Sequence, residues 1–255
     1  MNAAFDLTGR TALVTGAARG LGRAIALSLA DAGADVALGL RDKTTDGGLA
    51  AEIEAKGRRA LPLQMNVLDL AQGRAAIDAT VAAWGKIDIL VNNAGGGVAE
   101  RPVDAYGEAD FDLVVDLNVK STFFLTQYAG RHMRERRSGA VINMGSQAGA
   151  IALPGEAVYC LSKAAVSHMT KCFAVEWGKD NVRVNCVAPT FFETDGTAGM
   201  LSDETFHADV LDRIAALHRI GKPREVADAV TFLASDAASM ITGHTLMIDG
   251  GWTAR

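Results

Sequence analysis

Short apolar runs alternate with longer stretches of mixed polarity along the chain. The apolar runs are rich in Val, Ile, Leu and Ala, and they span residues 10–15, 35–40, 88–91, 140–143 and 182–187. Such runs are typical of strands buried on both faces of a parallel sheet. The stretches between them suit helices, for example 23–30, which is rich in helix formers and is closed by Gly33. The alternation predicts an α/β fold, with a doubly wound parallel sheet and helices on both faces.

The length and the composition suit one folded unit. The chain has 255 residues, with 27 glycines, 5 prolines and no linker-like break in composition. A chain of this length can bury a full core in one domain, so we expect a single domain over residues 1–255. Residues 190–206 are of mixed polarity and contain Gly196 and Gly199, which predicts a mobile substrate lid at about 190–216.

A glycine-rich turn follows the first predicted strand and precedes the first predicted helix. Gly16, Gly20 and Gly22 are spaced as G-x-x-x-G-x-G. Glycines let the backbone approach a phosphate, and a helix N-terminus offers unpaired N–H groups and the positive end of the helix dipole. Strand, turn and helix together predict a pyrophosphate site for a dinucleotide. The alternative is a plain tight turn.

The end of the second predicted strand bears on the choice of dinucleotide. Leu40 and Arg41 stand where an NAD-selective site has an acid for the ribose 2′-hydroxyl. Arg41 and Arg19 can instead hold the 2′-phosphate of NADP(H), whereas Asp42 can serve as the missing acid, displaced along the chain. We predict NADP(H), with NAD(H) as the alternative. A third interpretation is that both arginines are solvated surface residues.

Tyr159 and Lys163 are the main candidates for proton chemistry. They are at positions i and i+4, so they share one face of a helix. Ser146 lies thirteen residues before Tyr159. A free phenol has a pKa of roughly 10, and a neighbouring cation lowers it. The pair therefore predicts a tyrosine that exchanges a proton with a carbonyl or alcohol oxygen, to which Ser146 donates a hydrogen bond. The alternative is an exposed i,i+4 contact without a catalytic role.

Taken in order, these motifs resemble the short-chain dehydrogenase/reductase family over almost the whole chain. Residues 15–22 resemble its T-G-x-x-x-G-x-G turn, and residues 92–95 match its N-N-A-G. Residues 189–194 resemble its P-G-x-x-x-T segment, and residues 243–251 resemble its last strand. The resemblance implies a Rossmann-like sheet of about seven strands. It also implies an NAD(P)-dependent oxidoreductase that acts on CH–OH groups.

The resemblance further implies roles for particular residues. The catalytic set is Asn118, Ser146, Tyr159 and Lys163. By resemblance, Lys163 also holds the nicotinamide ribose, and Asn118 holds a water that links Lys163 to solvent, with a backbone cap as the alternative. The residues expected to bind the cofactor are Gly16, Arg19, Gly20, Leu21, Gly22, Arg41, Asn66, Val67, Asn93, Ala94, Gly95, Tyr159, Lys163, Pro189, Phe192 and Thr194.

Two residues depart from the family pattern at the expected cofactor site. Thr190 follows Pro189 where the family usually has glycine, and Asn66 stands where it often has an aspartate. An asparagine carbonyl still accepts a hydrogen bond. Neither change touches the proton-transfer group.

The expected substrate pocket is lined by Gln147, residues 153–158 and the segment after Pro189. Gln147 and Glu156 suit a hydroxylated substrate, so we predict a secondary alcohol or ketone of the sugar, polyol or sugar-acid kind. One alternative is a 3-oxoacyl-[acyl-carrier-protein] reductase. Family members with that role often carry a basic residue before the glutamate of this helix, where Val175 precedes Glu176 here. Another alternative is a non-catalytic nucleotide-binding scaffold.

Charge and composition narrow the remaining classes. The net charge of −5 argues against general nucleic-acid binding, and no apolar stretch reaches membrane-spanning length. The first residues lack the features of a signal peptide. We therefore expect a cytoplasmic protein that binds neither nucleic acid nor membranes. We also expect no catalytic metal, because the five histidines show no paired ligand spacing. The cysteines read as reduced thiols without metal spacing; they are Cys160, Cys172 and Cys186.

Two features concern contacts with other chains. The first is a basic cluster that either ends a helix or docks an acidic partner; it consists of Arg131, Arg134, Arg136 and Arg137. The second is the apolar character of two expected helices, at 108–135 and 157–178. By resemblance these helices pair between the subunits of a homotetramer; the alternative is that they simply pack on the sheet.

Overall fold

The computed structural model describes residues 3–254, and a parallel sheet forms its centre. Among these residues seven strands lie in the order β3-β2-β1-β4-β5-β6-β7, and each pair of neighbours is parallel. The strands are β1 (Thr11–Thr15), β2 (Asp35–Leu40), β3 (Ala60–Gln64), β4 (Ile89–Asn92), β5 (Gly139–Met144), β6 (Val182–Pro189) and β7 (Thr245–Ile248). The predicted doubly wound sheet is confirmed. Its strand order reverses between β1 and β4, which is where this architecture binds ligands.

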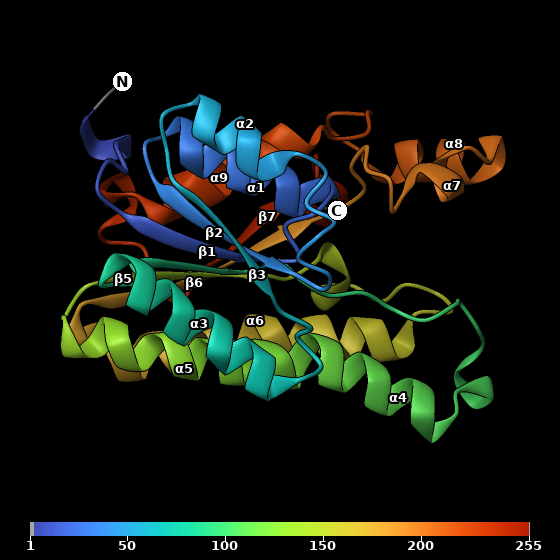
Figure 1. Ribbon diagram of the computed structural model, residues 1–255. Coiled ribbons are helices and arrows are strands. Elements are labelled where there is room, and N and C mark those ends of the chain that lie inside the picture. Colours follow the sequence, from blue (N-terminus) through green and yellow to red (C-terminus); the bar gives the residue numbers. More distant parts are fainter. Residues whose placement is uncertain (1–2, 255) are drawn as a thin grey trace.

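Helices cover both faces of the sheet (Figure 1). One layer consists of α1 (Gly20–Asp31), α2 (Leu49–Ala55) and α9 (Pro223–Ala234). The other consists of α3 (Leu70–Trp84), α4 (Glu108–Val115), α5 (Ser121–Glu135) and α6 (Ala157–Trp177). The short helices α7 (Ala198–Leu201) and α8 (Glu204–Arg213) stand at the right-hand end of Figure 1, within the segment predicted as a lid.

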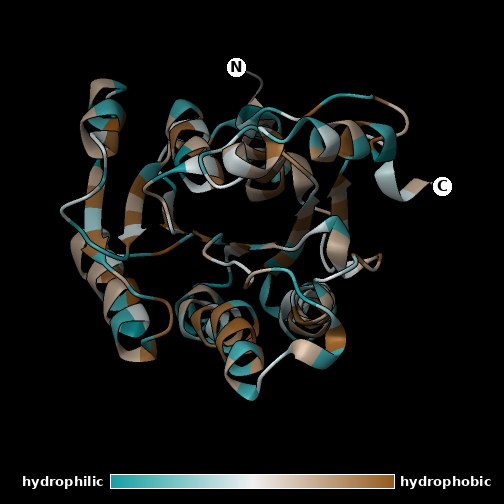
Figure 2. Cartoon of the chain, turned by 90° about the vertical axis from the view of Figure 1, so that its right-hand side faces the viewer, coloured by the Kyte–Doolittle hydropathy of each residue, from teal (hydrophilic) through white to brown (hydrophobic). Residues whose placement is uncertain are grey.

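The core has two halves, one under each helix layer. On β1, Val14 belongs to the apolar cluster that includes Ile25 of α1 and Val230 of α9. Its neighbour Leu13 belongs to the opposite cluster, with Leu125 of α5. Successive side chains of a strand point to opposite faces, so a strand covered on both faces must be apolar throughout. In Figure 2 the helices of both layers carry hydrophobic and hydrophilic segments in alternation, as amphipathic helices on a sheet do.

The predicted helix at 108–135 is not one regular helix. A π-helical turn at Asp116–Lys120 joins α4 to α5. Such turns are rare and are frequent at functional sites. This one carries Asn118, which is 1% exposed, so the irregularity fixes the position of a predicted catalytic residue.

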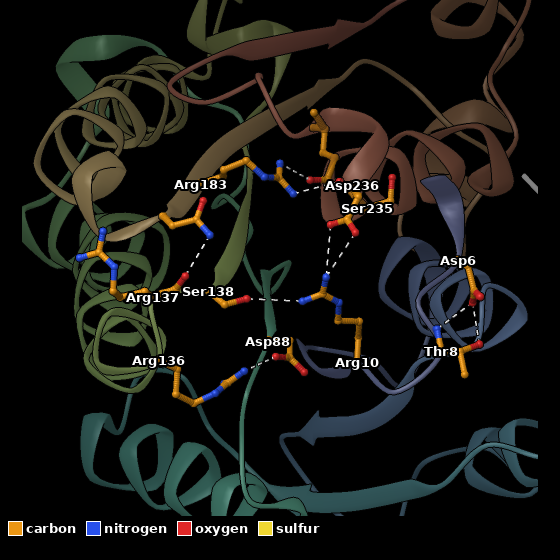
Figure 3. A network of polar contacts seen from close by, with 12 residues as sticks. Asp6, Thr8, Arg10, Asp88, Arg136, Arg137, Ser138, Arg183, Ser235 and Asp236 are labelled. Atoms are coloured by element: carbon orange, nitrogen blue, oxygen red, sulfur yellow. Dashed lines mark hydrogen bonds and ion pairs between the residues drawn. The ribbon is translucent and has the colours of Figure 1, made fainter. Parts of the chain in front are cut away.

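A polar network joins the amino ends of the strands to both helix layers (Figure 3). Arg10 pairs with Asp236 at 3.2 Å and donates to Ser138 Oγ at 3.4 Å. Asp88, only 2% exposed, pairs with Arg136 at 2.5 Å. These groups lie at the edge of the sheet opposite the carboxyl ends of the strands, so the network ties the layers together away from the expected site.

The basic cluster at 131–137 lies at the end of α5. Arg134 pairs with Asp180 at 2.6 Å, and Arg137 approaches the same carboxylate at 3.9 Å. Arg136 pairs with the buried Asp88. These arginines have partners within the chain, which favours the helix-end interpretation over a docking patch.

Two kinds of feature are missing from residues 3–254. Not one helix there combines the length and the apolar character that a bilayer crossing requires. No group of three or more His, Cys, Asp or Glu side chains is arranged to hold a metal ion.

Candidate functional site

A cleft of about 1230 Å³ runs along the carboxyl ends of the strands. It brings together residues that are far apart in the sequence and that come from the segments after β1, β2, β3, β4, β5 and β6. The predicted site residues on its walls are Gly16, Arg19, Gly20, Leu21, Gly22, Arg41, Asn66, Val67, Asn93, Ala94, Gly95, Ser146, Tyr159, Lys163, Pro189, Phe192 and Thr194. Among the predicted catalytic and cofactor-binding residues, Asn118 does not line the cleft; it lies buried behind Gly95 and Gly96. Gln147 and residues 153–158, predicted to wall the substrate pocket, do not line it either.

Other wall residues were not predicted from the sequence. Leu113 and Leu117 reach the cleft from α4 and the π-helical turn. Helical periodicity alone does not show which face of this segment meets a ligand. Thr45 and Leu68 come from turns whose position depends on the sheet order. Of these four residues, Thr45 could have been proposed from the sequence, because it lies four residues after Arg41, the arginine predicted to bind a phosphate.

The glycine turn after β1 is shaped for close approach. Gly16 and Gly20 have φ of +64° and +56°, a region that side chains disfavour. A Cβ on Gly22 would lie 2.2 Å from the Gly16 carbonyl oxygen. Asn93 fixes this arrangement from β4, since its Nδ2 donates to the carbonyls of Thr15 and Gly16 at 2.9 and 3.2 Å. The turn therefore presents backbone, not side chains, at the start of α1.

The second strand ends in a charged turn at the same end of the cleft. Asp42 Oδ1 accepts hydrogen bonds from the backbone N–H and the hydroxyl of Thr44, at 2.9 and 2.7 Å. These two bonds lower the pKa of the Asp42 carboxyl. The guanidinium groups of Arg19 and Arg41 are exposed and form no ion pair with any residue of 3–254. Two unpaired cations thus face this end of the cleft, while the nearby acid is engaged by its own turn.

Asn66 and Val67 lie beside this turn. The Asn66 side-chain oxygen accepts a hydrogen bond from the Leu68 N–H at 3.2 Å, and its backbone N–H donates to Gln72 at 3.0 Å. The side-chain carbonyl keeps a second lone pair for a ligand. Val67 is 7% exposed and gives this wall an apolar surface.

The segment after Pro189 closes the other side of the cleft. Phe192 is 4% exposed, and a Cβ on Gly20 would lie 3.5 Å from Thr194 Cβ, so this segment packs on the glycine turn. Thr190, where the family usually has glycine, has its hydroxyl oxygen buried without a hydrogen-bond partner among residues 3–254. The departure adds an unsatisfied polar atom next to the cleft.

Tyr159, Lys163 and Ser146 meet at the far end of the cleft from Arg41. Lys163 is 5% exposed, and its Nζ donates to the Met144 carbonyl at 2.8 Å and lies 5.6 Å from the centre of the Tyr159 ring. Ser146 is 7% exposed; its hydroxyl donates to Gln147 Oε1 at 2.7 Å and accepts from the Ala148 N–H at 3.1 Å. The side chains predicted to act together are therefore brought together.

Asn118 holds the loop after β4 against this group. Its side-chain oxygen accepts from the Gly96 N–H at 2.9 Å, and its Nδ2 donates to the Gly96 carbonyl at 2.8 Å and to Ser162 Oγ at 2.9 Å. A Cβ on Gly95 would lie 2.8 Å from Asn118 Oδ1 and 3.2 Å from Lys163 Nζ. These bonds show that the Asn118 side chain caps the backbone of Gly96, which was the alternative interpretation of this residue.

The electrostatics of the pair differ from the sequence-based prediction. Burial raises the pKa of Tyr159 to about 12, although an interaction with the Ser146 hydroxyl opposes the rise. Burial also lowers the pKa of Lys163 to about 8. The net pKa of Tyr159 is therefore raised in this structure, where the sequence analysis expected it to be lowered by Lys163. The physical reason is desolvation, which disfavours both charged forms, while the ammonium lies over the ring and binds the Met144 carbonyl.

Comparisons with known proteins agree with this geometry. A family model described as enoyl-(acyl carrier protein) reductase matches residues 16–253. The chain is 39% identical to 2-dehydro-3-deoxy-D-gluconate 5-dehydrogenase of Escherichia coli K12, over 99% of this chain and 98% of the relative. It is 39% identical to D-threitol dehydrogenase of Mycolicibacterium smegmatis, over 98% and 95%. It is 40% identical to 3-oxoacyl-[acyl-carrier-protein] reductase of Thermotoga maritima, over 96% and 98%.

Solved structures share the whole fold. A gluconate 5-dehydrogenase of Burkholderia cenocepacia, in complex with NADP and tartrate, has a TM-score of 0.94 at 36% identity and covers 99% of this chain and 98% of its own. A short-chain type dehydrogenase/reductase of Mycobacterium marinum has a TM-score of 0.93 at 37% identity and covers 99% and 98%. With the strand order, the glycine turn and the Ser146–Tyr159–Lys163 group in place, the chain belongs to the short-chain dehydrogenase/reductase family of oxidoreductases.

Proposed function

We propose that this chain catalyses hydride transfer between NADP(H) and a secondary alcohol or ketone of the sugar, polyol or sugar-acid kind. The observation that carries the proposal is one continuous cleft with two unpaired arginines, Arg19 and Arg41, at one end and the Ser146–Tyr159–Lys163 group at the other. The relatives named for gluconate-type and threitol substrates support the substrate class.

The residues of the cleft fit a dinucleotide. The cradle leaves no room for a side chain at Gly22, and Gly16 and Gly20 have positive φ, which side chains disfavour. The helix α1 that follows offers unpaired N–H groups to a pyrophosphate. Arg19 and Arg41 suit a 2′-phosphate, and the engagement of Asp42 by Thr44 makes it a weaker acceptor for a 2′-hydroxyl. The solved gluconate 5-dehydrogenase with NADP supports the same preference, with NAD(H) as the alternative.

The chemistry follows from the groups at the far end of the cleft. A bound nicotinamide supplies the hydride chemistry. In reduction Tyr159 donates its hydroxyl proton to the substrate oxygen, and its raised pKa keeps that proton in place at neutral pH. Ser146 can turn its hydroxyl from Gln147 to the same oxygen and stabilise the charge that develops there. In oxidation the deprotonated form of Tyr159 accepts the alcohol proton as the hydride leaves the carbon.

Lys163 and Asn118 support this proton transfer. A protonated Lys163 stabilises negative charge near the Tyr159 ring. Its pKa of about 8 leaves the ammonium form dominant at neutral pH and sensitive to mild alkali. Asn118 holds Gly96 and so fixes the loop that lies against Lys163; we propose that it also keeps the water that connects Lys163 to solvent.

The main alternative is reduction of 3-oxoacyl groups on a carrier protein. The relative of Thermotoga maritima supports it. Against it stands Val175, which is 84% exposed just before Glu176, where carrier-binding relatives often have a basic residue. A non-catalytic scaffold is a third possibility, and it predicts cofactor binding without turnover.

A substrate panel separates these functions. We expect the purified protein to oxidise polyols, sugars or sugar acids with NADP⁺, at kcat/KM at least about tenfold above that with NAD⁺. It should reduce an acetoacetyl thioester poorly. Efficient thioester reduction without polyol turnover would favour the carrier-protein role. Cofactor binding without turnover of any member of the panel would favour the scaffold.

We propose that residues 1–255 form a single domain, with a lid at about 190–216 that covers the substrate. The small apolar cluster of Val210, Ile214 and Trp252 anchors this segment. We also propose a cytoplasmic location, which the three free thiols support.

We propose that the chain is a homotetramer. Large apolar side chains are exposed on α4, α5 and α6, where the sheet does not cover them; they are Phe111, Leu113, Phe123, Leu161 and Val175. An apolar surface of this kind on adjacent helices suits contact with a second copy related by a two-fold axis. Light scattering should give four times the chain mass; a monomer at micromolar concentration would contradict the proposal.

A further inference from the structure

Glu156 lies close to Tyr159, beside the proposed active site, although it is not among the residues that line the cleft. It is the residue before α6 and lies three residues before Tyr159, so the two side chains are neighbours on one helical turn. Glu156 is half-buried. Its carboxyl makes no side-chain cap at the start of α6 and no ion pair with any residue of 3–254. The oxygens of this partly buried carboxylate can therefore still accept hydrogen bonds from a ligand.

Two loops place Glu156 and Glu100 beside Tyr159. A Cβ on Gly97 would lie 3.5 Å from Cδ2 of the Tyr159 ring, so the loop after β4 covers that ring. A Cβ on Gly155 would lie 3.2 Å from Glu100 Cβ. Burial, together with the charge of Glu100, raises the pKa of Glu156. Glu156 also contributes to the raised pKa of Tyr159, so the three groups share one electrostatic environment.

The segments around this point carry little free positive charge. The basic side chains of residues 96–101, 147–158 and 190–216 are Arg101, His207 and Arg213. Arg101 is paired with Asp110 at 2.7 Å and Arg213 with Asp209 at 2.7 Å. His207 carries charge only when it is protonated. The expected lid instead supplies carboxylates, which are Glu193, Asp195, Asp203, Glu204, Asp209 and Asp212.

We propose that Glu156 determines substrate charge: it accepts a hydrogen bond from a hydroxyl of a neutral polyol and repels the carboxylate of a sugar acid. The inference rests on the proposed function and narrows its substrate class to alditols and the matching uncharged keto sugars. Two like charges in a partly desolvated site repel far more than in water. A hydroxyl, by contrast, gains a charge-assisted hydrogen bond from the same carboxylate. On this proposal the substrate of this chain is uncharged, like that of the relative named for threitol and unlike those of the relatives named for gluconate-type acids.

The test compares matched pairs that differ in charge. D-Threitol, D-arabinitol and D-glucitol are each assayed against the aldonate of the same carbon skeleton, with NADP⁺ as the oxidant. For the best of the three alditols, we expect kcat/KM to be at least about tenfold higher than for the aldonate of the same carbon skeleton. In Glu156→Gln the amide still accepts a hydrogen bond but without the charge assistance, so kcat/KM for the alditol should fall about three- to tenfold through KM. For the aldonate kcat/KM should rise about tenfold, also through KM, because the like charge is gone.

Glu176→Gln is the matched control, because it removes the same charge from the exposed far end of α6. It should leave the ratio of alditol to aldonate unchanged. Raising the ionic strength should narrow the ratio in the wild type and not in Glu156→Gln, a dependence that a purely structural role of Glu156 does not produce. NADPH affinity, measured by fluorescence titration, shows whether Glu156→Gln is folded; if it is not, the ionic-strength series on the wild type decides.

The outcomes separate this inference from the proposed function. A wild type that prefers aldonates, or an unchanged ratio in a folded Glu156→Gln, overturns the role of Glu156 and leaves the proposed function standing. Absence of turnover for every alditol and every aldonate overturns both.

Discussion

At the scale of single residues, burial sets the properties of the proton-transfer pair. Tyr159 and Lys163 are each pushed toward their neutral forms, with pKa values of about 12 and about 8. The sequence shows that a phenol and an ammonium share a helix face, but it does not show how much water each keeps. Desolvation therefore outweighs the expected attraction, and the lysine becomes the group that titrates near physiological pH.

This titration predicts a pH dependence. A lysine is charged below its pKa, so the supporting cation at Lys163 is lost as the pH rises through about 8. We expect kcat/KM for ketone reduction with NADPH to fall above that pH in the wild type. In Lys163→Arg the guanidinium stays charged, so this fall should move up by at least about two pH units, even if the plateau rate is lower. The same inflection in both proteins would exclude Lys163 as its source.

A second prediction at this scale concerns the cofactor. Arg41 is exposed at the end of the cleft away from Tyr159 and pairs with no acidic side chain of residues 3–254. Arg41→Ala should raise the KM for NADPH by about 10- to 100-fold, as expected for the loss of a charge-assisted hydrogen bond, and the KM for NADH by less than about threefold. Arg74→Ala, on the exposed face of α3, is the control. Equal changes for the two cofactors would contradict a phosphate-binding role.

At the scale of elements, the turn between β1 and α1 depends on missing side chains. A Cβ on Gly22 would lie 2.2 Å from the Gly16 carbonyl oxygen and 2.6 Å from Asn93 Nδ2. Asn93 also holds this turn through a hydrogen bond to the Thr15 carbonyl. A side chain at Gly22 would therefore displace Asn93 and the whole glycine turn, and not only residue 22 itself.

Gly22→Ala should therefore weaken NADPH binding by at least about tenfold and cost about 1–3 kcal/mol in the free energy of unfolding. Gly178→Ala is the matched control, since a Cβ there meets nothing within 4 Å and its φ of −55° suits any residue. Fluorescence titration and thermal unfolding measure the two effects. Normal NADPH affinity in Gly22→Ala would show that the turn does not cradle the phosphates.

Some elements could be predicted from the sequence, and others could not. The alternation of apolar runs predicted the parallel sheet, and local spacing predicted the glycine turn and the Tyr159–Lys163 pair. The π-helical turn that places Asn118 was not predicted, because it depends on how α4 and α5 pack on the sheet. The same holds for Leu113 in the cleft wall and for the unpaired state of Glu156, which depend on tertiary contacts and not on the local pattern.

At the scale of the whole molecule, the network at the amino ends of the strands joins the two layers (Figure 3). Asp88 is its buried anion: it accepts from the Thr11 N–H at 2.9 Å and pairs with Arg136 at 2.5 Å and Lys86 at 3.1 Å. Burial raises the pKa of the Asp88 carboxyl, but the bonds from Arg136, Thr11 and Lys86 outweigh it, so the net pKa is lowered.

A lowered carboxyl pKa stabilises the fold above the unfolded value of about 3.9, and this contribution is lost as the pH falls through the folded pKa. Asp88→Asn should lower the free energy of unfolding by about 1–3 kcal/mol at pH 7, because the buried group loses its charge-assisted hydrogen bonds from Arg136, Thr11 and Lys86. The difference from wild type should shrink as the pH falls below about 4. Asp180→Asn, which removes the ion-pair partner of the exposed Arg134, should shift the melting temperature much less. A constant difference between pH 3 and pH 7 would contradict this account.

The most direct test of the central claim is the turnover of Tyr159→Phe in the presence of NADPH. The substitution removes one hydroxyl from a side chain whose ring packs against Gly97, so fold and NADPH affinity should stay close to wild type. Without its proton donor, ketone reduction should fall by more than about a hundredfold. Near-normal kcat with unchanged NADPH affinity would show that another group supplies the proton.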